Sequence, residues 1–336
     1  MPLIHMTTRD NEQMKFDCAA DQNLLDAAAA AKIFLPSQCR QGSCGVCLAT
    51  VTSGDYELGE HDSKLLDSGV GSILMCRTKP LSDLKIALPY DRARILTHAP
   101  KWRMAEIVAL ETVAQDTMRL ELQLPSDAEG GSVAEFEPGQ FMELEIPGTE
   151  EHRAYSIANT PNWDGVFEFF IRLRTGGRFS TYLRSEGKIG DQIAMRGPFG
   201  AFGMDENSLR PAWFVAGGTG LAPLLSMLRR MAELQNMREV RLFFGVTYEN
   251  ELFAMDALER LKSDLLQFST EFCVWRPSIN WRGITGTPVK ALSEALAATG
   301  AQPDLYVCGP GPLIDATFEV AKAAGIPREQ VFSERF

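Results

Sequence analysis

Four cysteines near the start of the chain constrain its fold more than any other feature. Cys39, Cys44 and Cys47 lie on one short loop and Cys76 follows later, which gives the spacing C-x4-C-x2-C-x28-C. This spacing is typical of a plant-type [2Fe–2S] cluster, in which four thiolates hold two irons. Small residues between the cysteines allow backbone N–H groups to point at the cluster sulfurs, which stabilises the reduced state. We therefore expect the four cysteines to be metal ligands and their domain to carry single electrons.

Two other interpretations of these cysteines are weaker. A structural zinc site usually pairs two short Cys or His hooks, and the sequence has no second hook or nearby histidine pair. Disulfides need an oxidising compartment, whereas the segment Met1–Asp10 is polar and lacks an apolar signal segment. We expect a cytoplasmic protein in which Cys18, Cys273 and Cys308 are free thiols.

Length and charge narrow the class of protein further. A chain of 336 residues is long enough for two or three domains, and its 45% hydrophobic content is ordinary for a globular protein. No apolar run of about 18 residues is present, so we expect no membrane span. The net charge of −11 argues against a nucleic-acid partner, because a phosphate-binding surface needs a basic excess.

Three patterns of expected elements follow one another along the chain. Residues 1–92 combine short strands with one helix at Leu24–Ile33, capped by Asp21 or Asn23, and a closing strand at Leu81–Leu88. This pattern indicates a small α+β domain of the β-grasp ferredoxin type. Residues 93–102 form a basic, turn-poor stretch that we interpret as a linker.

Residues 103–208 contain short strands separated by turn signals, which is typical of a closed antiparallel β-barrel. The expected strands are Ala105–Glu111, Thr117–Leu124, Phe141–Ile146, Ala154–Ile157, Val166–Arg172 and Gln192–Arg196, with one helix at Phe179–Glu186. In residues 209–336 strands and helices alternate, which indicates an α/β domain with a doubly wound parallel sheet. Its expected elements are Ala212–Ala216, Pro223–Gln235, Val240–Val246, Ala254–Lys262, Glu271–Trp275, Pro288–Ala298, Leu305–Cys308 and Leu313–Ala324.

Two motifs of the middle region suit a flat ring with a pyrophosphate. Along one strand, Arg153 can pair with a phosphate, Tyr155 can lie against a ring, and Ser156 offers a hydroxyl to a ring nitrogen. The loop Gly176–Ser180 enters a helix, where free N–H groups and the helix dipole attract an anion. The alternatives are an ordinary amphipathic strand and an ordinary glycine-rich turn.

Two glycine loops of the last region suit a dinucleotide. The apolar strand ending at Ala216 enters Gly217–Pro223, whose glycines allow phosphates to approach the backbone. The spacing is not G-x-G-x-x-G, so a tight structural turn is the alternative. The segment Leu305–Pro312 repeats the arrangement of a buried strand that enters a glycine loop. Cys308 is either a packed core thiol or a residue beside the nicotinamide, and we favour the second interpretation.

In this order, the motifs Arg153–Ser156, Gly176–Ser180, Gly217–Pro223 and Cys308–Pro312 resemble those of the ferredoxin–NADP⁺ reductase superfamily. With the cysteine loop in front, the whole chain resembles the NADH-dependent reductase components of bacterial oxygenases. Benzoate and anthranilate dioxygenase reductases share this order, as do phenol, toluene and soluble methane monooxygenase reductases. The resemblance implies FAD, NADH and a [2Fe–2S] cluster as cofactors, with electrons passing from NADH to FAD, to the cluster and to an oxygenase.

The resemblance also implies roles for residues at matching positions. Arg153, Tyr155 and Ser156 would hold FAD, while Ser156, Cys308 and Glu334 would flank the hydride-transfer site. The glycine-loop residues implied to hold phosphates or NADH are Gly176, Gly177 and Ser180, then Gly217, Gly218, Thr219, Gly220 and Gly309. Phe336, or alternatively Phe332, would cover the flavin; the alternatives are that Phe332 belongs to a last core strand and Phe336 to a frayed terminus. Thr175 departs from the resemblance, since many relatives have proline before the paired glycines.

The segment Gly245–Leu252 bears on the choice between nicotinamide cofactors. It offers Glu249 and Glu251 and no base, and two carboxylates would repel a 2′-phosphate. We predict NADH over NADPH, although the two glutamates could be only a solvated face.

The electron acceptor follows from the resemblance and the cysteine loop. Arg40 after the first ligand is similar to the benzoate dioxygenase group, so we favour a Rieske-type aromatic ring-hydroxylating dioxygenase as the terminal oxygenase. A di-iron monooxygenase is the alternative, because the ending Ser333–Phe336 is similar to phenol hydroxylase reductases. A deoxysugar dehydratase and a redox-sensing or scaffold role are further alternatives. We expect transient docking at the loop around Arg40, Gln41 and Ser43.

Overall fold

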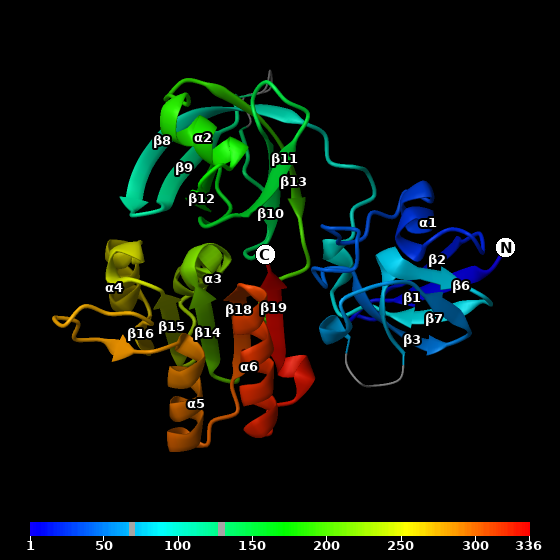
Figure 1. Ribbon diagram of the computed structural model, residues 1–336. Coiled ribbons are helices and arrows are strands. Elements are labelled where there is room, and N and C mark those ends of the chain that lie inside the picture. The colour runs from blue at the N-terminus through cyan, green and yellow to red at the C-terminus, as the bar shows by residue number, and fades with distance from the viewer. Residues whose placement is uncertain (67–70, 127–131) are drawn as a thin grey trace. The chain divides into compact units, whose positions relative to one another are not determined.

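The structure is a computed structural model that describes residues 1–66, 71–126 and 132–336 (Figure 1). The described chain divides into two compact units. The first unit comprises Met1–Lys101 with Phe199–Ala201, and the second comprises Trp102–Pro198 with Phe202–Phe336. No helix among the described residues combines the length and the apolar composition that a membrane span requires.

A mixed sheet in the order β2-β1-β7-β3-β5 forms the first unit. Its strands are β1 (Leu3–Thr7), β2 (Gln13–Asp17), β3 (Leu48–Ser53), β5 (Ser72–Leu74) and β7 (Leu84–Ala87). β1 and β7 run parallel, and the other neighbouring pairs run antiparallel. A small second sheet pairs β4 (Tyr56–Leu58) with β6 (Thr78–Pro80). Helix α1 (Leu24–Ala30) buries Leu24, Leu25, Ala27 and Ala28 in the core of this unit.

In the first unit the cap of α1 agrees with the expectation, whereas the end of α1 and the fold of residues 93–96 differ from it. Asn23 caps α1, because its side chain accepts a hydrogen bond from the Asp26 N–H at 2.9 Å. The helix ends at Ala30 and not at Ile33, since Lys32 has a φ of 61° that no right-handed helix contains. Ile95 lies in the core of this unit, so residues 93–96 fold with it and do not begin a linker as expected for 93–102.

The second unit begins with an antiparallel sheet in the order β11-β10-β13-β8-β9-β12. Its strands are β8 (Arg103–Ala114), β9 (Thr117–Gln123), β10 (Phe141–Glu145), β11 (His152–Ser156), β12 (Val166–Arg172) and β13 (Gln192–Phe199). The two ends of this sheet meet just after β11, where the Ala158 N–H donates to the Glu168 carbonyl at 2.8 Å. Helix α2 (Arg178–Ser185) packs Phe179 and Leu183 into the core that the sheet encloses.

A parallel sheet in the order β17-β16-β15-β14-β18-β19 completes the second unit. Its strands are β14 (Ala212–Gly217), β15 (Val240–Val246), β16 (Phe268–Val274), β17 (Ile284–Thr285), β18 (Asp304–Gly309) and β19 (Val331–Arg335). Its helices are α3 (Leu221–Glu233), α4 (Met255–Asp264), α5 (Pro288–Thr299) and α6 (Gly311–Ala323). β19, which pairs in parallel with β18, corresponds to the last core strand that was expected at Phe332 only as an alternative.

Side chains of the central strand β14 alternate between two cores. Phe214 and Ala216 pack with residues of α3 and α4, whereas Trp213 and Val215 pack with residues of α5 and α6. Helices therefore cover both faces of the parallel sheet, which explains why its central strands read as unbroken apolar runs. The carboxyl ends of β14 and β18 carry the two glycine loops, so this edge of the sheet positions the site described below.

Candidate functional site

The four cysteines of the first unit stand in two pairs. A hydrogen bond joins the side chains of Cys39 and Cys44, and another joins Cys47 and Cys76. A [2Fe–2S] cluster has four cysteine ligands shared by two irons, so a two-and-two arrangement fits it. Over the residues that the structure describes, no group of three or more Cys, His, Asp or Glu side chains is arranged to hold a metal ion, so the ligand role of the four cysteines stays a prediction.

The four thiols differ in how readily they lose their protons. Burial raises the pKa of Cys39, but the Ser43 side chain and the backbone N–H groups of Gln41 and Ser43, each 3.4 Å from the sulfur, lower it to about 6. The hydrogen bond between Cys47 and Cys76 raises the pKa of Cys47 well above its ordinary value and lowers that of Cys76 to about 7, while burial raises the pKa of Cys44 to about 11. Metal-binding thiols must lose their protons, and the surroundings of Cys39 and Cys76 favour this.

The backbone of the cysteine loop requires glycine at position 42. Gly42 has a φ of 78°, and a Cβ there would lie 3.0 Å from both the Arg77 Cγ and the His61 Cβ. Its N–H also hydrogen-bonds to Cys76. The loop therefore folds tightly enough for backbone donors to reach ligand sulfurs, as the sequence predicted.

In the second unit, the three predicted catalytic residues lie together although they are distant in the sequence. The Ser156 hydroxyl donates to Glu334 Oε2 at 2.8 Å, and the Cys308 Sγ lies 3.9 Å from the same oxygen. Cys308 and Glu334 are directly opposite each other in the register of β18 and β19. The end of β11 supplies Ser156, so this contact joins the antiparallel sheet to the parallel one.

The Glu334 carboxyl is buried and titrates near neutrality. Burial raises its pKa from 4.5 to about 7, although hydrogen bonds from Ser156 and Cys308 act in the opposite direction. Burial likewise raises the pKa of the Cys308 thiol well above its ordinary value. A carboxyl of this kind can hold or release a proton at working pH, with the Ser156 hydroxyl as its hydrogen-bonded neighbour.

Arg153 of β11, a predicted phosphate-binding residue, and Arg178 at the start of α2 together form a cationic cluster. Arg153 donates to the Glu151 carboxylate at 3.0 Å, and Arg178 donates to the other oxygen of the same carboxylate. Two guanidinium groups that share one carboxylate lie close enough to share a diphosphate. Beside them, the Tyr155 ring lies 5.5 Å from the Phe179 ring, and burial raises the pKa of Tyr155 to about 12. Glu151 and the role of Arg178 were not found from the sequence.

In the loop before α2, the predicted residues mainly determine the conformation of the backbone. Gly177 is the N-cap of α2, and Gly176 lies just before it with a φ of 73°. Ser180 is buried, and its hydroxyl oxygen accepts a hydrogen bond from the Arg174 N–H at 2.9 Å. This bond shapes the loop and leaves the hydroxyl hydrogen free to donate.

The two glycine loops of the parallel sheet pack against each other. A Cβ on Gly220 would lie 2.2 Å from the Cys308 carbonyl oxygen, which excludes any side chain there. Gly217, Gly218 and Thr219 precede it at the end of β14, and Gly309 follows Cys308 with its Cα near Gly217. The loop thus brings backbone N–H groups, the start of α3 and Cys308 to one place.

The region expected to face the adenosine ribose differs from the sequence-based interpretation. Glu251 accepts the Thr247 N–H at 2.8 Å, and Glu249 accepts the Ser278 hydroxyl at 2.9 Å, so both carboxylates are engaged in local bonds. A base also lies nearby, since the Arg276 guanidinium is 3.5 Å from the Tyr248 hydroxyl. Arg276 follows β16 and could not be placed beside this segment from sequence alone.

The two candidate phenylalanines near the end of the chain have different surroundings. Phe332 stacks on Tyr306 with ring centroids 4.9 Å apart and belongs to the core. Phe336 follows β19, and its side chain is 50% exposed. Phe336 is therefore the one with a ring free to cover a bound ligand, and its flavin role stays a prediction.

Three family profiles match the chain in the expected order. A 2Fe-2S iron-sulfur cluster binding domain matches residues 7–81, an oxidoreductase FAD-binding domain matches 104–204, and an oxidoreductase NAD-binding domain matches 214–319. The three-domain organisation and the three expected cofactors are thereby confirmed. The protein is an oxidoreductase that combines flavin, nicotinamide and iron–sulfur domains in one chain.

Relatives that match nearly the whole chain define the family. The reductase component of propane 2-monooxygenase from Rhodococcus jostii (strain RHA1) is 32% identical, covering 99% of this chain and 91% of the relative. The electron transfer component of toluate 1,2-dioxygenase from Pseudomonas putida is 33% identical, covering 95% and 94%. A solved Amycolatopsis cytochrome P450 reductase is 27% identical, with a TM-score of 0.72 over 99% of this chain and 98% of that one. The chain belongs to the family of NADH-dependent reductase components of multicomponent oxygenases.

Proposed function

We propose that this protein takes electrons from NADH and delivers them singly to a terminal oxygenase. The observation that carries the proposal is the meeting of Ser156, Cys308 and Glu334 where β11, β18 and β19 end, beside both glycine loops. When bound, FAD supplies hydride acceptance and the [2Fe–2S] cluster supplies one-electron transfer. The proposal includes a β-grasp ferredoxin domain, a flavin-binding antiparallel barrel and a doubly wound nucleotide-binding domain.

The cationic cluster and the glycine loops would bind the cofactors. Arg153 and Arg178 would hold the FAD diphosphate, and Tyr155 would lie against the ring system. The N–H groups of Gly217–Gly220 and Gly309, at the start of α3, would hold the NADH phosphates. In the first unit, Cys39 and Cys44 would ligate one iron, and Cys47 and Cys76 would ligate the other.

Ser156, Cys308 and Glu334, which are in contact with one another, would position the flavin and hold a proton at the site of hydride transfer. The Ser156 hydroxyl donates its one hydrogen to Glu334 Oε2 in this structure, and with Glu334 protonated that hydrogen would be released to donate to a ring nitrogen and orient the flavin. Because burial raises the pKa of Glu334 to about 7, that carboxyl could exchange a proton with the Ser156 hydroxyl near neutral pH. Cys308 would close the site against the nicotinamide and exclude water.

The first experiment tests the reductase reaction itself. The purified protein, loaded with FAD and cluster, should lose its flavin absorbance when NADH is added without oxygen. Ser156→Ala should slow this bleaching by about 10- to 100-fold, because the ring loses its hydrogen-bond partner. A wild-type protein that binds both cofactors and ignores NADH would refute the proposal.

The partner would dock at the exposed face of the cysteine loop. Arg40, Gln41 and Ser43 are exposed there, and Arg40 is ion-paired with Asp26 at the surface. Relatives serve a dioxygenase and a monooxygenase at similar identity. We therefore propose a Rieske dioxygenase on the ground of Arg40, with a monooxygenase as the second candidate.

Two measurements test the docking site and the partner. Arg40→Glu should slow electron delivery to the oxygenase and leave NADH-driven ferricyanide reduction intact. Lys15→Glu makes the same charge change on the edge strand β2 and should affect neither rate. If Arg40→Glu lowers both rates together, the docking proposal is wrong.

A Rieske EPR signal from the oxygenase captured with this chain and reduced by NADH would support the dioxygenase, and a captured oxygenase without that signal would support the monooxygenase.

A further inference from the structure

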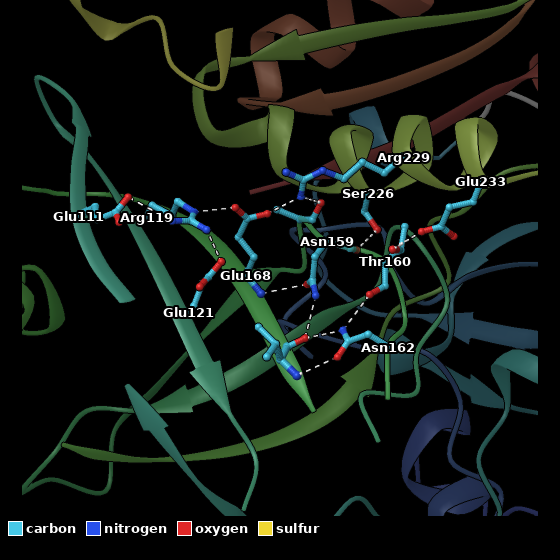
Figure 2. Close-up of polar contacts among 12 residues, drawn as sticks. Glu111, Arg119, Glu121, Asn159, Thr160, Asn162, Glu168, Ser226, Arg229 and Glu233 are labelled. Carbon is cyan, nitrogen blue, oxygen red and sulfur yellow. Dashed lines mark hydrogen bonds and ion pairs between the residues drawn. The ribbon is translucent and has the colours of Figure 1, made fainter. Parts of the chain in front are cut away.

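One face of helix α3 makes polar contacts with the antiparallel sheet that the proposed electron path does not use (Figure 2). Ser226, Arg229 and Glu233 share this face, because they are three and four residues apart. The Ser226 hydroxyl donates to the Asn159 carbonyl at 2.6 Å, and the Thr160 hydroxyl donates to the Glu233 carboxylate. Arg229 lies between Ser226 and Glu233 in the sequence, and its side chain contacts Glu168 and the Ala158 carbonyl.

A buried carboxylate forms the centre of the contact. Glu168 of β12 is 5% exposed, and its Oε1 accepts a hydrogen bond from the Arg119 Nε at 2.7 Å. Its Oε2 accepts from the Arg229 Nη1, which also donates to the Ala158 carbonyl at 2.9 Å. One arginine thus comes from the same sheet and the other from α3 (Figure 2). A buried charge that loses a partner is costly, so the alignment in which both arginines reach Glu168 is strongly favoured.

Apolar packing surrounds this charged centre. Ala158 and Phe170 of the antiparallel half pack in the same core as Leu225 of α3, and the Phe170 ring lies 4.8 Å from the Phe253 ring. Apolar burial is non-directional, whereas hydrogen-bonded ion pairs have a fixed geometry. The apolar contacts therefore hold the two halves together, and the Glu168–Arg229 pair determines how they are aligned.

Both sides of the contact lead within a few residues to the proposed hydride-transfer site. Asn159 follows Ser156 by three residues, and α3 begins immediately after Gly220. A shift of α3 along the sheet would move the NADH-binding loop relative to the flavin-binding strand. We propose that Glu168 and Arg229 are positioning residues for hydride transfer, which align the nicotinamide-binding loop with the flavin-binding strand. This inference rests on the proposed function.

The test uses the full-length protein loaded with FAD and cluster, reduced by NADH in an anaerobic stopped-flow instrument. Arg229→Met should lower the limiting rate of flavin reduction by about 10- to 100-fold, the usual effect of misplacing reactants by about 1 Å. The dissociation constant of NADH, taken from the concentration dependence of that rate, should change by less than about threefold. Arg229→Lys keeps the charge and should recover most of the rate. Arg260→Met, which removes the same charge from the exposed side of α4, is the matched control and should be reduced as fast as wild type.

A purely structural role would give a different result. If Arg229→Met fails to fold, Glu168→Gln is the milder variant, since it keeps the shape of the side chain and an acceptor for one arginine, while its NH2 cannot accept from the other. The inference is overturned if the variants lose FAD or thermal stability while their FAD-loaded fraction is reduced at the wild-type rate. If wild type itself is not reduced by NADH, the proposed function fails first. Normal wild-type reduction with unaffected variants overturns this inference alone.

Discussion

Replacing Glu334 with glutamine should stabilise the protein at pH 8 much more than at pH 5. Burial raises the pKa of this carboxyl from 4.5 to about 7 in the folded chain. Between these two pH values, the Glu334 carboxyl keeps its proton in the folded state and loses it in the unfolded state. The contribution of Glu334 to stability is thus fully present below pH 4.5 and is lost as the pH rises through 7. Glutamine keeps the shape and an acceptor for Ser156 but cannot ionise.

The size of the effect follows from the pKa difference. At pH 8 the difference of about 2.5 pKa units corresponds to about 3 kcal/mol, and at pH 5 linkage leaves only about 1 kcal/mol. For a unit of this size, about 3 kcal/mol shifts the melting temperature by roughly 6–12 °C. Glu334→Gln should therefore melt several degrees above wild type at pH 8, and within a few degrees of it at pH 5.

Thermal unfolding of the flavin-free protein at the two pH values measures this difference without a contribution from cofactor release. Glu329→Gln is a suitable control, because Glu329 is exposed and lies just before the same strand. Its melting temperature should follow wild type at both pH values. If Glu334→Gln and wild type differ equally at pH 5 and pH 8, the carboxyl is not titrating as argued and the reasoning is refuted.

Three further predictions concern the cofactor sites. Cys76→Ser should abolish the visible absorption of the cluster while NADH still reduces the flavin, and an unchanged spectrum would exclude Cys76 as a ligand. Gly220→Ala places a Cβ 2.2 Å from the Cys308 carbonyl oxygen. It should destabilise the protein by about 1–3 kcal/mol and abolish reduction by NADH; a wild-type melting temperature in that variant would contradict the packing argument. Arg276→Glu should lower kcat/KM for NADPH and leave that for NADH unchanged, because it replaces a base with a carboxylate near the expected ribose site. Equal losses with both nucleotides would show that Arg276 does not distinguish them.

The fold could be predicted from the sequence wherever local patterns determine it. The strand Ala212–Gly217 was recognised because its residues are buried on both faces and therefore form a continuous apolar run. The strand Val331–Arg335 was expected only as an alternative, because its polar residues hide the pattern and its partner, β18, lies more than twenty residues away. Lys32 ended a helix early through a φ of 61°, which no propensity rule anticipates for lysine.

The site was predicted only where a family resemblance supplied long-range information. Ser156 and Glu334 meet across 178 residues of chain, a contact that no periodicity contains. Glu168 was visible as a charge within the apolar strand Val166–Arg172, yet its partner Arg229 is 61 residues away. Arg276, which follows β16, could not be placed near Tyr248 from the sequence for the same reason, and the role expected of the two carboxylates stays a prediction.

The packing of Gly220 against Cys308 has a consequence for redesign of the enzyme. The reacting end of the nucleotide site is interlocked, because the glycine loop of β14 touches the backbone of β18 without room for one more carbon atom. The expected ribose end, where Tyr248 and Arg276 meet, is exposed, and the Arg276 guanidinium lies over the Trp275 ring. Cofactor preference and hydride chemistry thus occupy mechanically separate parts of the same sheet edge. Selection for a different nicotinamide cofactor can change the ribose end freely, whereas the interlocked end tolerates almost no mutation.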